Sequence, residues 1–277
     1  IGDRDKKSLL QLARRYPDLP TDQMAEKGPI SYEARDGLTI EGFLTMPRGQ
    51  TDGPVPAIVF PHGGPISFEG SGFDYWTQYF ASRGYAVLQM NFRGSAGYGY
   101  DFMASGLQGW GLEMQNDVED GTRWLVEQGI ADPDRICVVG ASYGGYAALM
   151  EAARNPDLYQ CAVSFAGVAD VAYLVTSHRR YSNYDVVREQ IGTDYSELRK
   201  RSPLHNAEAI NIPVLLAHGT DDRSVRIRHS QKMAKELEKE GKDVTYLEFE
   251  DGDHFLSLQE HRIAFFRAME AFLQEHL

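Results

Sequence analysis

The chain has 277 residues, of which 42% are hydrophobic and 25% charged, a composition typical of a globular protein with a large core. Its net charge of −12 argues against the basic surface that nucleic-acid binding requires. No apolar run reaches the roughly 18 residues of a membrane-spanning helix. We therefore expect a soluble protein, cytoplasmic or periplasmic, with no nucleic-acid or membrane partner.

The first 29 residues differ in character from the rest of the chain. They are charged, are interrupted by Pro17 and Pro20, and contain neither a starting Met nor the apolar segment of a signal peptide. We expect a leading segment over 1–29, cut from a longer chain, and a single domain over 30–277. The domain opens with two alternating runs, 30–35 and 39–46, around Asp36-Gly37, which predicts a β-hairpin.

Apolar runs that alternate with helical patterns follow the hairpin. The predicted strands contain AIVF, YAVLQM, RICVV, QCAVSF, IPVLLAH and DVTYLEF, and helical patterns cover 75–83, 114–129, 147–154, 228–241 and 258–277. This order predicts an α/β fold with an eight-stranded, mostly parallel sheet, helices on both faces, and an antiparallel opening hairpin. Residues 165–211 break the alternation, and we expect them to form a helical excursion over the carboxyl ends of the strands, where open α/β sheets bind ligands.

The sequence offers no cofactor or metal motif. It has no CxxC or HExxH spacing, so we expect no metal ligands and no cofactor. Cys137 and Cys161 both begin apolar runs, and we expect two buried core thiols rather than a disulfide.

Ser142 lies in GASYGG, between a strand-like and a helix-like run. The pattern G-x-S-x-G in this context predicts a sharp turn that presents the serine hydroxyl at the carboxyl edge of the sheet. Gly140 and Gly144 would allow the close backbone approach that the turn needs, and Gly145 would leave room for the helix to pack. A serine in this position is a candidate nucleophile, provided that a base takes its proton.

The base and the acid should follow Ser142 in the order acid, then histidine. His254, in the turn DGDHF after the last predicted strand, meets this requirement. His229, His261 and His276 fall inside helical patterns, where we expect solvated side chains, and His218 ends a strand, where we expect a structural role. For the acid, Asp221 and Asp222 both follow the penultimate strand, and Asp170 follows the strand before it; the residues alone leave all three open.

The oxyanion of an acyl-transfer reaction needs backbone N–H groups directed at the developing charge. The N–H of Tyr143, directly after the candidate nucleophile, is one expected donor. The other should come from HGGP at 62–65, where Gly63 and Gly64 allow the backbone to turn its amides inward.

Five motifs in order, HGGP, NFRGSAGYG, GASYGGYAAL, HGTDDRSV and GDHF, resemble the catalytic domain of the prolyl oligopeptidase family of serine peptidases. The resemblance covers about 30–277 and is greatest to the acylaminoacyl-peptidase and dipeptidyl-peptidase branch. It implies an α/β-hydrolase fold and a Ser-Asp-His triad. Its H-G-x-x-D pattern selects Asp222 over Asp221, and it assigns His254 as the base and the Gly64 and Tyr143 amides as oxyanion donors.

The resemblance also implies a substrate pocket. Matched position by position, its lining would comprise Val168, Val171, Leu174 and Val225, which are smaller than the aromatic residues common there, so we expect a pocket of different shape. Arg93 and Asp117 match family positions that we interpret as a structural ion pair.

The family normally carries an amino-terminal β-propeller that this chain lacks, so we expect a propeller in the full-length protein. The resemblance implies a serine peptidase that hydrolyses short peptides or N-blocked aminoacyl peptides through an acyl-enzyme. A carboxylesterase with the same triad and a non-catalytic binding module are the alternatives. Without the propeller an apolar face would be exposed, and we expect this chain to self-associate into homo-oligomers.

Overall fold

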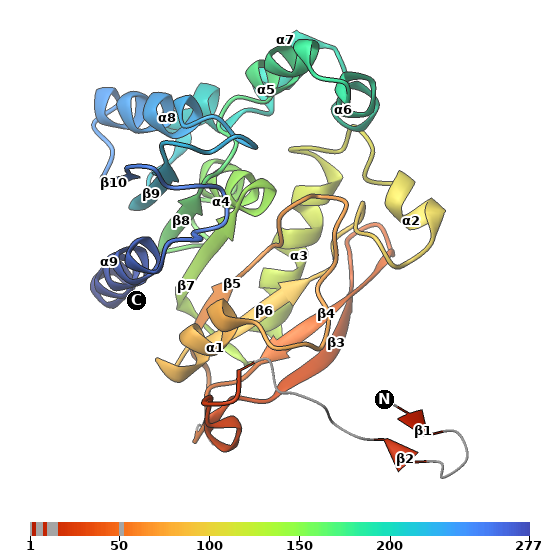
Figure 1. Cartoon of the computed structure of the whole chain (residues 1–277), viewed down its shortest axis with the longest axis vertical. Helices are drawn as coiled ribbons and strands as arrows, with labels where there is room; N and C mark the ends of the chain where they lie inside the picture. The colour runs from red at the N-terminus through yellow and green to blue at the C-terminus, as the bar shows by residue number, and fades with distance from the viewer. Residues whose placement is uncertain (1, 4–7, 10–15, 50–52) are drawn as a thin grey trace.

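A computed structural model describes residues 2–3, 8–9, 16–49 and 53–277 (Figure 1). The strands β1 (Gly2–Asp3) and β2 (Ser8–Leu9) pair with each other, and a 3-10 helix, η1, covers Thr21–Gln23. Part of the predicted leading segment, residues 1, 4–7 and 10–15, lies outside the described residues. The large sheet begins at Lys27, three residues before the predicted start of the domain.

The large sheet has eight strands in the order β10-β9-β8-β7-β5-β6-β4-β3, which confirms the predicted number. Their bounds are β3 Lys27–Glu33, β4 Thr39–Thr45, β5 Val55–Val59, β6 Ala86–Met90, β7 Ala131–Ala141, β8 Cys161–Phe165, β9 Val214–Gly219 and β10 Val244–Phe249. The strands from β10 to β6 are parallel. The predicted hairpin β3–β4 is antiparallel, and β4 is antiparallel to β6 as well.

Helices cover both faces of the sheet, as predicted. On one face lie α3 (Glu113–Glu127), α4 (Tyr143–Arg154) and α8 (Arg228–Lys239), and on the other lie α1 (Tyr75–Ser82) and α9 (Gln259–His276). Successive strand residues point to opposite faces, so the core divides into two clusters. In β7, for example, Ile136 and Val138 belong to the cluster under α3 and α4, and Val139 belongs to the cluster under α1 and α9.

Cys137 and Cys161 form a disulfide, so the prediction of two free core thiols is wrong. The two residues are directly paired in the neighbouring parallel strands β7 and β8 and face the same side, with Cα atoms 4.8 Å apart. This separation lies in the range that a disulfide can bridge. The sequence could not show it, because strand register is a long-range property.

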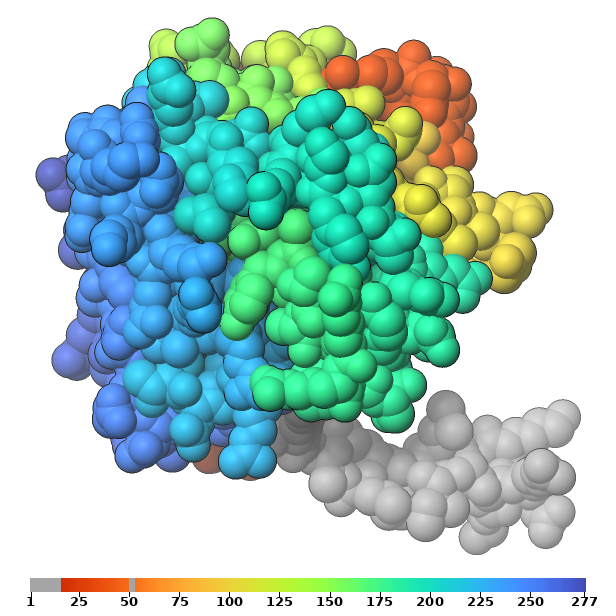
Figure 2. All heavy atoms as spheres, turned by 90° about the horizontal axis from the view of Figure 1, so that it is seen from above, coloured from red at the N-terminus to blue at the C-terminus, as the bar shows by residue number. Residues whose placement is uncertain are grey.

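The predicted excursion between β8 and β9 is helical. It contains α5 (Val171–Ser177), η2 (His178–Arg180), α6 (Tyr184–Ile191), α7 (Tyr195–Lys200) and η3 (Pro203–Ala209). In Figure 1 α5, α6 and α7 lie at the upper end of the molecule, and in Figure 2 the excursion forms much of the face seen from that side. A further short helix, α2 (Tyr100–Ala104), follows β6.

Arg93 and Asp117 form the structural ion pair that we predicted. The Arg93 guanidinium donates to Asp117 at 2.7 Å, with the Asp117 side chain fully buried, and also to Asp36 at 2.7 Å. The pair thereby joins the loop after β6 to α3 and to the turn of the opening hairpin. Within the described ranges, no helix is both long and apolar enough to cross a membrane.

Candidate active site

Ser142 occupies a strained turn between β7 and α4. Its backbone has φ 59° and ψ −120°, a conformation that costs a residue with a side chain of order 1–3 kcal/mol. Such strain persists only where the surrounding structure enforces it, and it is frequent at functional sites. The turn places Ser142 at the amino terminus of α4 and at the carboxyl end of a central strand, as the sequence predicts.

The three glycines around Ser142 are required by close packing. A Cβ on Gly140 would lie 2.1 Å from the Gly144 carbonyl oxygen, and one on Gly144 would lie 2.1 Å from the Pro61 carbonyl oxygen. A Cβ on Gly145 would lie 2.7 Å from Ser164 Oγ. Since real Cβ contacts are not this short, the interpretation of these glycines as elbow residues is confirmed.

The HGGP loop lies directly against this turn. A Cβ on Gly63 would be 3.5 Å from the Ser142 Cβ, and Gly64 has φ +127°, which a glycine adopts without strain. His62 anchors the loop, because its Nδ1–H donates to the Gly63 carbonyl at 2.7 Å and its Nε2 lies 2.9 Å from Ser95 Oγ. Burial lowers the pKa of His62 to about 4, so the ring is neutral at neutral pH.

Asp222 and His254 meet across two loops. His254 Nδ1 donates to Asp222 Oδ2 at 2.6 Å, and the Asp222 side chain is fully buried. Asp221 is exposed, and its backbone N–H donates to the Gly252 carbonyl. Of the two adjacent carboxylates, Asp222 is therefore the one that contacts the imidazole.

Asp222 accepts hydrogen bonds at both of its oxygens. The backbone N–H groups of Ser224 and Val225 donate to Oδ1 at 2.8 and 2.9 Å, and His218 Nε2 lies 3.2 Å from Oδ2. Burial alone would raise the pKa of Asp222, but the hydrogen bonds from His218 and His254 outweigh it and hold the pKa well below its ordinary value. The carboxylate is thus ionised at any pH at which the protein would work.

His218 is fully buried behind this carboxylate, as the predicted structural role requires. Its Nε2 also lies 2.8 Å from the Val225 carbonyl, which can only accept, so Nε2 carries the proton. Its Nδ1 lies 2.7 Å from the Ser230 hydroxyl. The sequence predicts the position of His218 at the end of a strand but not its contact with the acid.

The remaining acid and histidine candidates lie elsewhere. Asp170 caps α5 by accepting the Tyr173 N–H at 2.9 Å. His229 is buried, not solvated as predicted, because α8 turns it beneath the excursion, where Nδ1 accepts the N–H groups of Ala169 and Asp170. His261 and His276 are half-buried.

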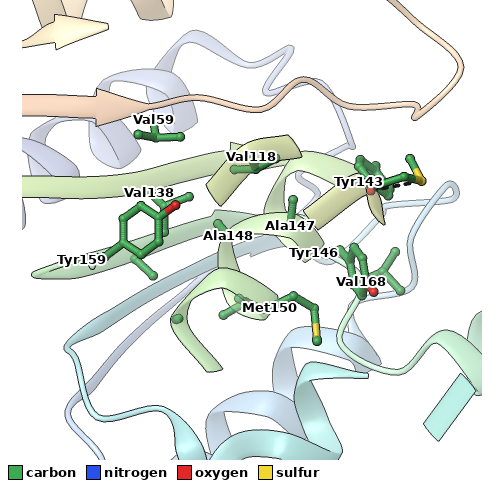
Figure 3. Packing of buried hydrophobic residues seen from close by; sticks show 14 of the residues in the cluster. Val59, Val118, Val138, Tyr143, Tyr146, Ala147, Ala148, Met150, Tyr159 and Val168 are labelled. Carbon is green, nitrogen blue, oxygen red and sulfur yellow. Dashed lines mark hydrogen bonds between the residues drawn. The ribbon is translucent and has the colours of Figure 1, made fainter. Parts of the chain in front are cut away.

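The predicted substrate-pocket residues share one environment. All four are buried, at 8% exposure or less, within the core cluster on the α4 and α8 side of the sheet: Val168, Val171, Leu174 and Val225. Figure 3 shows Val168 in this cluster together with Tyr143 and Tyr146 of α4. They lie on the same side of the turn as the Tyr143 side chain.

A cavity of about 250 Å³ opens beside His254 on the opposite side. Its lining includes Ala141 and Gly63, next to Ser142 and Gly64, and five aromatic side chains: Phe60, Tyr75, Trp76, Phe165 and Phe255. It brings the elbow, the HGGP loop and the base loop together around one space. No local sequence pattern predicts this lining, because it comes from segments as far apart as the loop after β5, α1 and the turn that carries His254.

One contact expected of a catalytic serine is not made. Among the described residues, no hydrogen bond joins the Ser142 hydroxyl to the His254 imidazole. In unliganded sites such catalytic hydrogen bonds are often long and tighten when substrate binds.

No group of three or more His, Cys, Asp or Glu side chains in the described part of the chain is arranged to hold a metal ion.

Comparison with known proteins places the chain in a family. The model of the prolyl oligopeptidase family matches residues 71–277, about three quarters of the chain. The chain belongs to the prolyl oligopeptidase family. Dipeptidyl aminopeptidase BIII of Pseudoxanthomonas mexicana is 34% identical over 99% of the chain, and the chain spans 42% of that protein.

Solved structures of the prolyl oligopeptidase family share the α/β-hydrolase fold of this chain. The acylaminoacyl peptidase of Pyrococcus horikoshii is 30% identical, with a TM-score of 0.83, and the match covers 92% of this chain and 42% of that one. A puromycin-hydrolysing peptidase of Mycobacterium tuberculosis is 27% identical, with a TM-score of 0.85, over 91% of this chain and 39% of that one. The chain thus spans about two fifths of the length of these relatives.

Proposed function

We propose that the chain is the catalytic domain of a serine peptidase. Ser142 Oγ attacks the scissile carbonyl carbon while His254 Nε2 takes the hydroxyl proton, and the same imidazole then gives the proton to the leaving amine as the C–N bond breaks. Water hydrolyses the resulting ester, again with His254 as the base. Asp222 holds the imidazole in the tautomer with Nδ1 protonated, and the Gly64 and Tyr143 amides stabilise the oxyanion.

The observation that carries this proposal is the strained backbone of Ser142. A serine at φ 59°, next to glycines that leave no space for a Cβ, lowers the stability of the fold. It lies at the same edge of the sheet as the Asp222–His254 pair. Support comes from the desolvated Asp222 carboxylate, which is suited to stabilise an imidazolium that forms transiently.

Short peptides are the proposed substrates. The relatives are named a dipeptidyl aminopeptidase, an acylaminoacyl peptidase and a puromycin-hydrolysing peptidase, and the first two names denote small groups at the end of a peptide. We further propose that Val168, Val171, Leu174 and Val225 line the pocket for the acyl-side residue. Their small side chains would suit a large apolar residue.

We also propose that the full-length protein carries a β-propeller. The chain spans only about two fifths of its relatives. Several large apolar side chains are exposed: Phe68 (61%) in the loop after HGGP, Tyr100 (71%) at the start of α2, and Phe255 (74%) in the turn that carries His254. A covering domain would bury them, and without it we expect this chain to self-associate.

The test is turnover of an amide and of the ester of the same acyl group, with blocked aminoacyl and unblocked dipeptidyl forms of each. We expect both leaving groups to be released by the chain and neither by its Ser142→Ala variant. Hydrolysis of the ester alone would point to a carboxylesterase, and no turnover by the folded chain or the full-length protein would point to a binding module.

A further inference from the structure

The cavity beside His254 lies over a different part of the core from the proposed acyl-side pocket. Four of its lining residues belong to the core cluster under α1 and α9: Phe60, Trp76, Phe165 and Leu256. The four residues of the proposed acyl-side pocket belong to the cluster under α4 and α8, on the other face of the sheet. Because Ser142 lies at the edge of a central strand, the two regions flank it on opposite sides.

Proton transfer assigns the two sides. In the proposed mechanism His254 protonates the nitrogen that leaves, so the leaving residue must lie on the same side of the scissile bond as the imidazole. His254 and its neighbours Phe255 and Leu256 form one wall of the cavity, and Ala141 and Gly63 bring it up to the reacting serine.

We propose that this cavity is the pocket for the leaving residue, the first residue after the scissile bond, and that it selects a large apolar or aromatic side chain. The inference rests on the proposed function and adds a specificity to it.

The size and the walls of the cavity support this selection. A volume of about 250 Å³ accommodates one large side chain but not two residues. Phe60 and Trp76 stack at 5.5 Å, Trp76 lies 6.5 Å from Phe165, and Phe255 stands edge-on to His254 at 5.3 Å. These faces would pack an aromatic ring in offset or edge-to-face contact.

The two carboxylates in the lining are already engaged. Asp74 accepts the Thr77 N–H at 2.7 Å as the cap of α1. Glu69 accepts from Gln89 Nε2 at 2.8 Å and lies 3.6 Å from Lys27 Nζ. Burial raises the pKa of Glu69, and Lys27 only partly opposes this. Because both carboxylates already have these partners, we expect the aromatic side chains to determine which leaving residue binds. The negative charge of the carboxylates would still repel an acidic leaving residue.

Capture of the acyl-enzyme by added amines tests this pocket directly. The amine nitrogen attacks the acyl carbonyl carbon, the C–O bond to Ser142 breaks, and the amine proton returns to Ser142 Oγ through His254, which is the reverse of acylation. The amine therefore binds where the leaving residue binds. The chain would be acylated with an activated ester, and the ratio of amide product to hydrolysis product measured for the amides of glycine, leucine, phenylalanine and aspartate.

We expect phenylalanine and leucine amides to capture the acyl group about tenfold or more better than glycine amide, and aspartate amide to capture it least. Phe255→Ala and Tyr75→Ala, both at exposed positions, should each reduce this preference severalfold. The matched control is Tyr100→Ala, an exposed aromatic outside the cavity, which should leave the order and the ratios unchanged.

Two results would overturn the inference. Equal capture of all four amides, or a preference that survives both cavity variants, would show that the cavity does not hold the leaving residue while leaving the proposed function intact. Failure to form any acyl-enzyme, seen as the absence of a mass adduct on the folded chain, would contradict the proposed function itself and this inference with it.

Discussion

The turn that carries Ser142 and the loop that carries Asp222 are held in place by different forces. The turn is defined by contacts between neighbouring backbone segments, since Gly140 and Gly144 leave no space for a side chain. The Asp222 loop is defined by hydrogen bonds from residues up to 32 positions away, including His254 and His218. Close backbone packing therefore fixes the position of the nucleophile. The position of the acid depends on several hydrogen bonds, which single substitutions can remove one at a time.

Removal of the nucleophile should have the largest effect. Ser142→Ala should lower turnover by about 10³-fold or more, because only binding and the oxyanion donors would remain. The fold should persist, since alanine occupies less space than serine. Steady-state kinetics with an amide substrate, together with thermal unfolding, measures both quantities, and retention of more than about a tenth of the activity would eliminate Ser142 as the nucleophile.

The next effect compares the adjacent aspartates. Asp222→Asn should lower kcat by about 10³–10⁴-fold, because an amide N–H facing Nδ1 would favour the wrong imidazole tautomer. Asp221→Asn, at an exposed position, is the matched control and should change kcat less than about tenfold. A reversed order in the two kcat values would assign the acid to Asp221.

An intermediate effect should follow from loss of the buried histidine behind the acid. His218→Phe removes a donor to a charged carboxylate, a hydrogen bond worth about 1.5–3 kcal/mol, and should lower kcat about 10–100-fold with little change in KM. Ser230→Ala keeps the imidazole and should have a smaller effect.

A merely structural His218 would give a different pattern in the same measurements. His218→Phe would then lower the free energy of unfolding without a change in kcat for the folded fraction. Urea unfolding and active-site titration separate the two cases.

The smallest effect concerns stability rather than turnover. It comes from Glu151, a buried residue of α4, the helix that follows Ser142. Burial raises the pKa of Glu151 from 4.5 to about 7, although hydrogen bonds from Asn155 and Tyr159 oppose this. The folded state therefore binds a proton that the unfolded state releases, and this stability is present at acid pH and is lost as the pH rises through about 7.

Glu151→Gln should remove this dependence. Between about pH 5.5 and about pH 8.5 the wild type should lose about 2 kcal/mol of unfolding free energy relative to the variant. Urea unfolding at the two pH values measures the difference, and parallel pH profiles for the two proteins would show that Glu151 is ionised in the folded state.

The contrast between turn and loop also explains what the sequence could predict. The elbow, the glycines and the hairpin follow from local backbone geometry, and the eight strands follow from hydrophobic runs between turn residues. The choice of Asp222 over Asp221 came only from the resemblance to the family, because adjacent residues differ in orientation and not in chemistry.

The errors and omissions share a long-range origin. The disulfide between Cys137 and Cys161 depends on the register of β7 against β8, and the burial of His229 depends on how the excursion folds over α8. The cavity beside His254 is assembled from segments that no local pattern connects. Such features arise from tertiary packing, which periodicity does not encode.

Labelling with a fluorophosphonate tests the central claim most directly, because the reagent reacts with a serine only where a base and an oxyanion site activate it. The account predicts a single adduct on Ser142 by peptide mass mapping, a much slower reaction in Asp222→Asn, and an unchanged rate in Asp221→Asn. An adduct on another residue, or equal labelling of the Ser142→Ala variant, would contradict it.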